Sequence, residues 1–148
     1  MRTLIRGGTV VSALGASLTD VVIDGDKIAA LVAPGSDTLG SLPELAERVI
    51  DATGRYVVPG GVDGHTHMEM PFGGTTASDT FETGTRAAAW GGTTTIIDFI
   101  VHHTGTPVLD GIVSWHEKAA GNCAIDYGFH QILAAVDDES LKAMDALM

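Results

Sequence analysis

The fold of this chain is decided by the stretch Pro59-Gly60-Gly61-Val62-Asp63-Gly64-His65-Thr66-His67, which ends in two histidines separated by one residue. In an extended backbone successive side chains point to opposite faces, so His65 and His67 point the same way and Thr66 points the other way. Two imidazoles on one face can bind one metal ion, since neutral imidazole is a common zinc ligand. The pair would supply half of a catalytic site, which also needs further ligands and an open position for water.

The residues before the pair place it at the end of a strand. Tyr56-Val57-Val58 is a short run rich in β-branched residues, and Pro59-Gly60-Gly61 lets the backbone turn sharply before the histidines. Without such context, two histidines at this spacing are more often hydrogen-bonded to their surroundings than bound to metal. We therefore predict ligands at the carboxyl end of a strand, where (β/α)8 barrels place their catalytic groups.

Three blocks of sequence follow one another along the chain: residues 59–72 (PGGVDGHTHMEMPF), 83–99 (TGTRAAAWGGTTTIIDF) and 126–130 (DYGFH). In this order they resemble the cyclic amidohydrolases, and within them the dihydropyrimidinase and hydantoinase group. The resemblance covers essentially the whole chain but only about the first third of a typical family member. It implies an α/β fold, made of the first three βα units of an amidohydrolase (β/α)8 barrel preceded by part of a small β-sandwich-like domain.

Composition and charge narrow the class of protein. Glycine is abundant, with 19 residues, and aromatic residues are few, as in part of a soluble α/β protein. A formal net charge of −11 argues against binding to nucleic acid or to an anionic membrane, because both reward Lys and Arg. Arg6 and Gly7 interrupt the amino terminus before a signal-peptide core forms, and no apolar run approaches a membrane span. With a single cysteine, Cys123, these features predict a cytoplasmic protein.

Short strands punctuated by turns are predicted in the first part of the chain, over residues 3–6, 9–12, 20–23, 27–32, 48–51 and 55–58. Asp24-Gly25 is a hairpin signal, because glycine tolerates the positive φ of tight turns. Residues 34–47 mix Pro, Gly, Ser and acidic side chains and indicate a surface excursion with one helical turn.

After Val58 the pattern changes to strands that alternate with helices, which is typical of βαβ units. We predict helices over residues 79–90, 108–120 and 138–148 and strands over 94–100 and 126–135. The first helix should have Asp79 as its N-cap and Glu82 as capping-box partner, and should end at Gly91.

The domain boundaries follow from this change of pattern. Residues 1–58 are predicted to be the N-terminal part of a small β domain, and residues 59–148 the start of a truncated metal-dependent barrel. About ninety residues follow Val58, whereas a (β/α)8 barrel typically needs about 250. We therefore expect a fragment of a larger enzyme, and we expect the fragment alone to be inactive.

The resemblance also implies the cofactor and its ligands. His65 and His67 should bind the more buried of two divalent metals, most often zinc, so that the full-length enzyme holds two Zn²⁺ ions. The family's bridging carboxylated lysine, two further histidines and the aspartate that acts as general base should lie downstream, so no catalytic residue is assigned within this chain. Lys142 is rejected as the bridge, because an ion pair with Asp138 one helical turn earlier explains it.

Residues near the pair suggest the substrate. Glu69 stands where the related dihydroorotases place an arginine that holds a substrate carboxylate, so a small neutral cyclic amide is favoured. Met68 and Phe72 are our candidates for apolar substrate-binding surface. Glu69 continues the alternation of the histidines, but the family does not use it as a ligand, and we interpret it as stabilising the loop.

Two acidic residues are candidates for holding the ligands in place. Asp63 precedes the pair by two residues and is predicted to orient one imidazole by a hydrogen bond. Asp98 ends a strand-like run and either serves the site in this way or caps the next loop. His102, His103 and His116 are interpreted as loop or helix-surface residues.

The resemblance implies an enzyme that hydrolytically opens dihydropyrimidine or hydantoin rings to N-carbamoyl amino acids, and that assembles as a homotetramer when full-length. Two alternatives stay open. The first is a non-catalytic dihydropyrimidinase-related scaffold or a truncated interaction module, and the second is another amidohydrolase such as an allantoinase. Retention of both His65 and His67 counts against a scaffold, since scaffolds of that class lose metal ligands.

Overall fold

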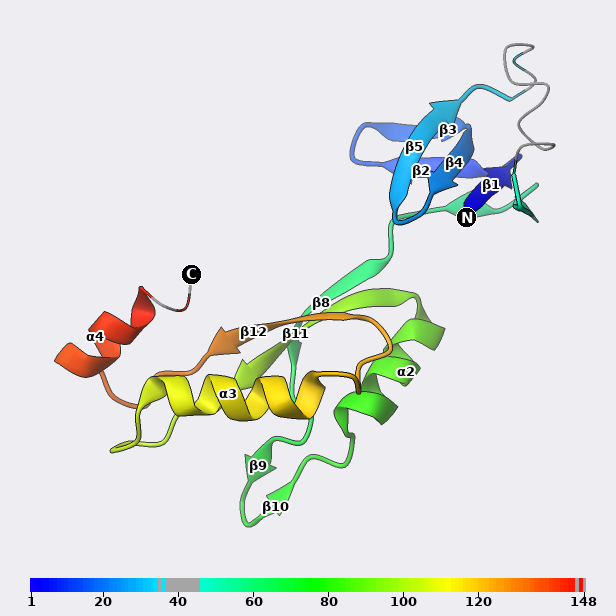
Figure 1. Ribbon diagram of the computed structural model, residues 1–148. Helices are drawn as coiled ribbons and strands as arrows, with labels where there is room; N and C mark the ends of the chain where they lie inside the picture. The colour runs from blue at the N-terminus through cyan, green and yellow to red at the C-terminus, as the bar shows by residue number, and fades with distance from the viewer. Residues whose placement is uncertain (35, 37–45, 146, 148) are drawn as a thin grey trace. The chain divides into compact units, whose positions relative to one another are not determined.

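The computed structural model describes residues 1–34, 36, 46–145 and 147. The chain divides into two compact units, Met1–Pro59 and Gly60–Met148 (Figure 1). The predicted excursion over residues 34–47 lies largely outside the described residues.

The first unit is built from two small sheets. One has the strand order β5-β4-β1-β6, and the other has the order β3-β2-β7 (Figure 1). Their strands are β1 (Arg2–Arg6), β2 (Thr9–Ser12), β3 (Gly15–Leu18), β4 (Asp20–Asp24), β5 (Lys27–Val32), β6 (Arg48–Asp51) and β7 (Tyr56–Val57). In the first sheet β1 pairs antiparallel with β4 and parallel with β6, and Leu4, Val21 and Val22 are buried.

Most strands of this unit lie where the sequence predicts them. The hairpin at Asp24-Gly25 is confirmed, since β4 and β5 pair antiparallel and Gly25 has φ +64°. The strand Gly15–Leu18 was not predicted, because its residues carry no apolar alternation, in agreement with their exposure to solvent. β7 pairs in parallel with β2 and so belongs to the β3-β2-β7 sheet of the first unit.

The second unit is a parallel sheet with helices on one face. β11 (Thr93–Ile100) lies in the centre, between β8 (Gly61–Thr66) and β12 (Asp126–Gln131), and pairs in parallel with both. The helices are α2 (Phe81–Gly91), α3 (Val108–Ala119) and α4 (Asp138–Met144), and a two-stranded hairpin of β9 (Pro71–Phe72) and β10 (Thr75–Thr76) follows β8. Figure 1 shows α2 and α3 beside the sheet, each between two of its strands in chain order.

The core of this unit lies between β11 and the helices. Along β11 every second residue is buried, so that Ile96, Asp98 and Ile100 face α2 and α3. The buried cluster consists of Phe81, Ile96, Ile100, Trp115 and Ala119. The residues between them, Ile97 and Phe99, consequently face the other side of the sheet, where the site is formed.

The first helix is capped differently from the prediction. Thr80, not Asp79, is the N-cap: its hydroxyl accepts a hydrogen bond from the Thr83 amide at 3.1 Å, and the Thr83 hydroxyl accepts one from the Thr80 amide at 3.0 Å. This reciprocal pair satisfies two amides that the helix leaves free. Asp79 accepts from the Thr83 hydroxyl instead, and Glu82 forms an ion pair with Arg86 at 2.8 Å.

Element ends differ by a few residues. α2 includes Gly91, and Gly92 is its C-cap with φ +88°, a conformation that favours glycine. β12 was predicted to reach residue 135 but ends at Gln131, because its pairing with β11 ends there. α4 ends at Met144. The observed fold is a mixture of sheet and helix, in which the second unit has a parallel sheet, and the closed (β/α)8 barrel stays a prediction. Within the described ranges no helix is long and apolar enough to cross a membrane.

Candidate functional site

The two histidines lie at the carboxyl end of β8. His65 is within the strand and His67 directly follows its last residue, and both side chains are exposed. Their ring centres are 4.9 Å apart, with the ring planes at 88°. The strand that carries them is Gly61–Thr66, whereas the sequence indicated Tyr56–Val58, which pairs within the first unit. The prediction of a strand end is right, but the strand itself was misassigned because its glycines give it no apolar pattern.

A bulge in β8 shapes this strand end. Ile96 is opposite Asp63, and Asp98 is opposite Thr66, so three residues of β8 span two residues of β11. Asp63 accepts a hydrogen bond from the backbone amide of His65 at 3.1 Å. The carboxylate thus holds the backbone of the bulge, and a bond from Asp63 to an imidazole stays a prediction.

Phe99 supports both imidazoles from the neighbouring strand. Its ring centre is 4.4 Å from that of His65 and 5.4 Å from that of His67. On its other side His130 of β12 lies 5.1 Å away. Four rings thus share the sheet face that is opposite to the helices. The sequence prediction did not single out Phe99. Because successive residues of a strand face opposite sides, placing Asp98 on the helix side would have placed Phe99 on the face of the histidines.

The geometry of the pair fits two ligands of one divalent ion. Imidazoles bound to one tetrahedral zinc ion have ring centres ~5 Å apart, given Zn–N distances of about 2.0–2.1 Å. The observed separation is 4.9 Å, and the described part of the chain offers no hydrogen bond to either ring. Among the described residues no group of three or more His, Cys, Asp or Glu side chains is arranged to bind a metal. The described residues therefore bring together a pair of candidate ligands rather than a complete site.

Asp98 lies directly behind the pair, on the helix side of the sheet. Its side chain has 0% exposure. One oxygen, Oδ2, accepts hydrogen bonds from the Thr66 hydroxyl at 2.9 Å and from the Met68 amide at 2.8 Å. The other oxygen accepts from the Trp115 indole at 3.3 Å. The carboxylate thereby holds the residues on both sides of His67.

Met68 does not line the space beside the histidines. Its side chain lies over Gly84 and packs against the buried cluster of the second unit. Its backbone amide faces Asp98, so alternation turns it away from the face of His67. The prediction of Met68 as substrate-binding surface is corrected on this ground, whereas Met70 lies beside His67 on the wall of a hollow.

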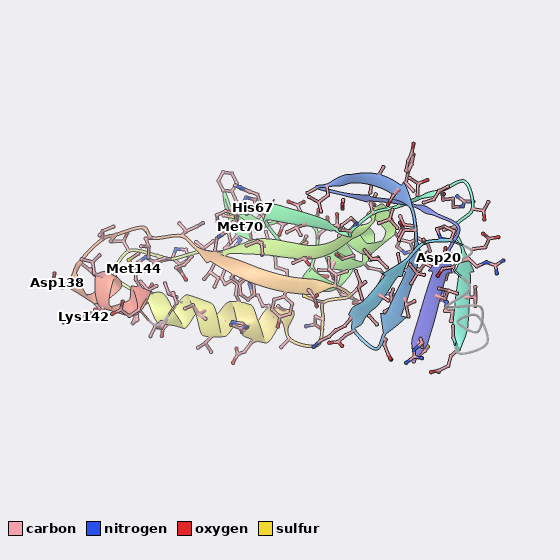
Figure 2. The ribbon with its side chains drawn as sticks, turned by 90° about the horizontal axis from the view of Figure 1, so that it is seen from above. Asp20, His67, Met70, Asp138, Lys142 and Met144 are labelled. Atoms are coloured by element: carbon pink, nitrogen blue, oxygen red, sulfur yellow. The ribbon has the colours of Figure 1, made fainter. Side chains whose placement is uncertain are left out.

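An open, mainly apolar hollow adjoins His67. It has a volume of about 430 Å³ and is lined by His67, Met70, Phe72, Thr75, Thr76 and Ala77. Figure 2 shows His67 and Met70 close together, near the end of β8. Phe72, which is 80% exposed, lies on the wall of this hollow, and its role as substrate-binding surface stays a prediction.

Glu69 stabilises the loop after the pair. Its φ of +52° is the one left-handed value among the described non-glycine residues, and it interrupts the alternation that would have aimed the side chain beside the imidazoles. The carboxylate accepts from the Phe81 amide at 3.3 Å, at the start of α2, where negative charge is favourable. Its amide donates to the Asp79 carbonyl at 2.9 Å. These bonds agree with the interpretation of Glu69 as a loop residue.

The remaining histidines have other surroundings. His102 was expected near solvent but is only 7% exposed, because Nε2 bonds to the Thr106 carbonyl at 2.9 Å and Nδ1 accepts from the Ala134 amide at 3.1 Å. It ties the loops after β11 and β12 together on the helix side. His103 is exposed in the loop, as predicted.

Cys123 and Lys142, two other chemically reactive side chains, are not part of the candidate site. Burial, and secondarily the charge of Asp98, raises the pKa of the Cys123 thiol, which makes it a poor nucleophile. Lys142 and Asp138 lie on α4 (Figure 2), but the predicted ion pair between them is not among those formed by the described residues.

Comparisons with known proteins show the family of this chain. Residues 48–135 match the amidohydrolase family. The chain is 59% identical to a D-hydantoinase of Streptomyces coelicolor, over 99% of this chain and 31% of the relative. It is 47% identical to a D-hydantoinase of Geobacillus stearothermophilus, over 97% of this chain and 29% of the relative.

A solved structure gives the same result. The dihydropyrimidinase from Brevibacillus agri superimposes with a TM-score of 0.88 at 46% identity, over 99% of this chain and 30% of that structure. The chain thus spans about 30% of the length of the relatives it matches. The predicted resemblance to the dihydropyrimidinase and hydantoinase group is confirmed.

Proposed function

Because the chain belongs to the amidohydrolase family, we propose that it is the N-terminal part of a metal-dependent cyclic amidase of the dihydropyrimidinase and hydantoinase type. Membership of the family implies use of a divalent metal. The observation that carries the proposal is the pair His65 and His67, placed 4.9 Å apart at the end of a parallel strand and supported by Phe99. We propose that β8, β11 and β12 are the first three strands of a (β/α)8 barrel, since their parallel order and the intervening helices are those of such a barrel.

The reaction proposed is hydrolysis of a ring amide bond, which yields an N-carbamoyl amino acid. Two divalent ions, proposed to be Zn²⁺, would activate water and polarise the ring carbonyl. Within this chain His65 and His67 would hold one ion, and Phe99 would support both imidazoles from the neighbouring strand. The remaining ligands and the general base are proposed to come from further strands of the barrel. The histidine pair favours this function over a scaffold that lacks metal ligands.

The substrate proposed is a small neutral cyclic amide, rather than nucleic acid or a membrane. The mainly apolar wall formed by Met70 and Phe72 beside His67 suits an apolar ring substituent. Glu69, which is engaged at the start of α2, adds negative charge that disfavours a substrate carboxylate. The net charge of −11 disfavours polyanionic partners. The full-length protein is proposed to be a homotetramer.

The first test is ring opening by the protein expressed from its complete coding sequence. Dihydrouracil and hydantoins with an apolar 5-substituent should be opened, with loss of ultraviolet absorbance, and a chelator should remove the activity until zinc is restored. Allantoin, a hydantoin whose 5-substituent is a polar ureido group, and dihydroorotate, which carries a carboxylate, should be poor substrates. The 148-residue chain alone should be inactive, because its described residues bring together only the two histidines, and the remaining ligands and the general base are proposed to come from further strands. Full activity after exhaustive chelation would contradict the proposal.

A second prediction concerns the apolar wall. Phe72→Ala should raise KM for 5-phenylhydantoin about tenfold, the equivalent of roughly 1.4 kcal/mol of lost apolar contact. KM for dihydrouracil, which has no such substituent, should change little. Phe72→Leu is the matched control and should keep most of the affinity. Equal changes for both substrates would remove Phe72 from the substituent site.

A further inference from the structure

The buried carboxylate of Asp98 is in an unusual position for a side chain of its kind. It has 0% exposure and faces the buried cluster between β11, α2 and α3. A buried carboxylate is costly unless its oxygens accept hydrogen bonds. Here three donors converge on it, from Thr66, Met68 and Trp115. None of the ion pairs formed by the described residues includes Asp98.

The donors show what the carboxylate positions. Two of the three come from the residues immediately before and after His67, and both bond to the same oxygen, Oδ2, at 2.9 and 2.8 Å. With Thr66 and Met68 held on the helix side, alternation of the backbone leaves His67 on the opposite face. There Phe99, the residue next to Asp98, meets the His67 ring with centres 5.4 Å apart.

The third donor connects this arrangement to a helix. Trp115 of α3 is 6% exposed and is packed in the buried cluster, and its indole N–H reaches the other carboxylate oxygen at 3.3 Å. The indole N–H is a donor and so occupies one carboxylate oxygen, Oδ1. The other oxygen, Oδ2, accepts the two bonds from the strand end. The side chain of Met68 packs over Gly84 and so anchors the same turn to α2.

We infer that Asp98 is a positioning residue for the metal site: by accepting hydrogen bonds from both neighbours of His67 and from Trp115, it fixes the imidazole of His67 relative to that of His65. This inference rests on the proposed role of the two histidines as ligands. It assigns the affinity for the ion partly to a residue that never contacts it, and to the helix α3 behind the sheet.

The test compares metal affinity with stability in the full-length protein. In the Asp98→Asn variant the amide oxygen can keep the bonds to Thr66 and Met68. The amide nitrogen then faces the Trp115 indole N–H, and two donors cannot form a hydrogen bond with each other. We expect the dissociation constant for zinc, measured by competition with a chromophoric chelator, to rise about 10- to 100-fold. Adding Trp115→Phe removes the opposing donor and should restore most of the affinity.

Thr85→Val is the matched control. Thr85 is also 0% exposed, and its hydroxyl bonds to the Phe81 carbonyl and accepts from the Ala124 amide, away from the strand end. It should lower the melting temperature of the metal-free protein without changing the zinc affinity. The inference would be overturned if the Asp98→Asn variant had a lower melting temperature but normal zinc affinity. It would also be overturned if the Thr85→Val variant lost zinc affinity to the same extent as Asp98→Asn.

The outcomes separate this inference from the proposed function. If the His65→Ala, His67→Ala double variant keeps wild-type zinc affinity, the ligand role fails and the inference fails with it. If the double variant loses zinc while Asp98→Asn does not, the inference alone fails. Should Asp98→Asn not fold, Thr66→Val removes one donor and should weaken zinc binding in the same direction, and unchanged binding would overturn the inference.

Discussion

Replacing His67 by alanine in the full-length protein should reduce ring opening of dihydrouracil or a 5-substituted hydantoin by about a thousandfold or more. The ion bound at this strand end would lose one of its ligands. Metal activation of water lowers the activation free energy by several kcal/mol, and each 1.36 kcal/mol changes the rate tenfold. The fold should survive, because His67 is exposed and its ring contacts only His65 and Phe99 among the described rings. The measurement is the rate of absorbance loss with zinc in excess.

His103→Ala is the control for this variant. His103 is an exposed histidine in the loop after β11 and lies outside the ring cluster at the strand end. It should retain wild-type turnover and metal content. Normal turnover by His67→Ala, with zinc content unchanged, would refute the role of the pair.

Replacing Phe81 by alanine should destabilise the second unit by about 3–5 kcal/mol. Phe81 is 0% exposed, begins α2, and packs against Ile96 and Trp115 in the buried cluster. Such a loss is a large part of the ~5–15 kcal/mol that stabilises a typical domain. Hydrogen exchange at the amides of β11 in the full-length protein should accelerate accordingly.

Trp90→Ala is the matched aromatic truncation on the same helix. Trp90 is 89% exposed, so its loss should change stability by no more than about 0.5 kcal/mol. Similar exchange rates at β11 in the Phe81 and Trp90 variants would contradict the assignment of the core to the face covered by α2 and α3.

The elements that the sequence predicts well are those whose side chains alternate or repeat. Val21, Val22 and Ile23 before Asp24-Gly25 predict a strand and a hairpin, and both are present. The run before Asp98 predicts the central strand of the parallel sheet within one residue. The spacing of His65 and His67 predicts two rings on one face, and the rings are on one face.

The errors come from places where long-range contacts decide local structure. Gly61–Thr66 shows no apolar pattern, and only its pairing with β11 makes it the strand that carries the histidines. The left-handed φ of Glu69 turns the chain after Met68, so counting alternate residues past this point fails. Two interpretations of Asp98 were open because its partner Trp115 lies 17 residues away on another element.

The most direct measurement of the central claim is anomalous diffraction at the zinc edge from crystals of the full-length protein grown with zinc. The account predicts an anomalous peak at the carboxyl end of β8, about 2.0–2.1 Å from one ring nitrogen of His65 and one of His67. An ordered site with both imidazoles free, and the zinc peak elsewhere or absent, would contradict it.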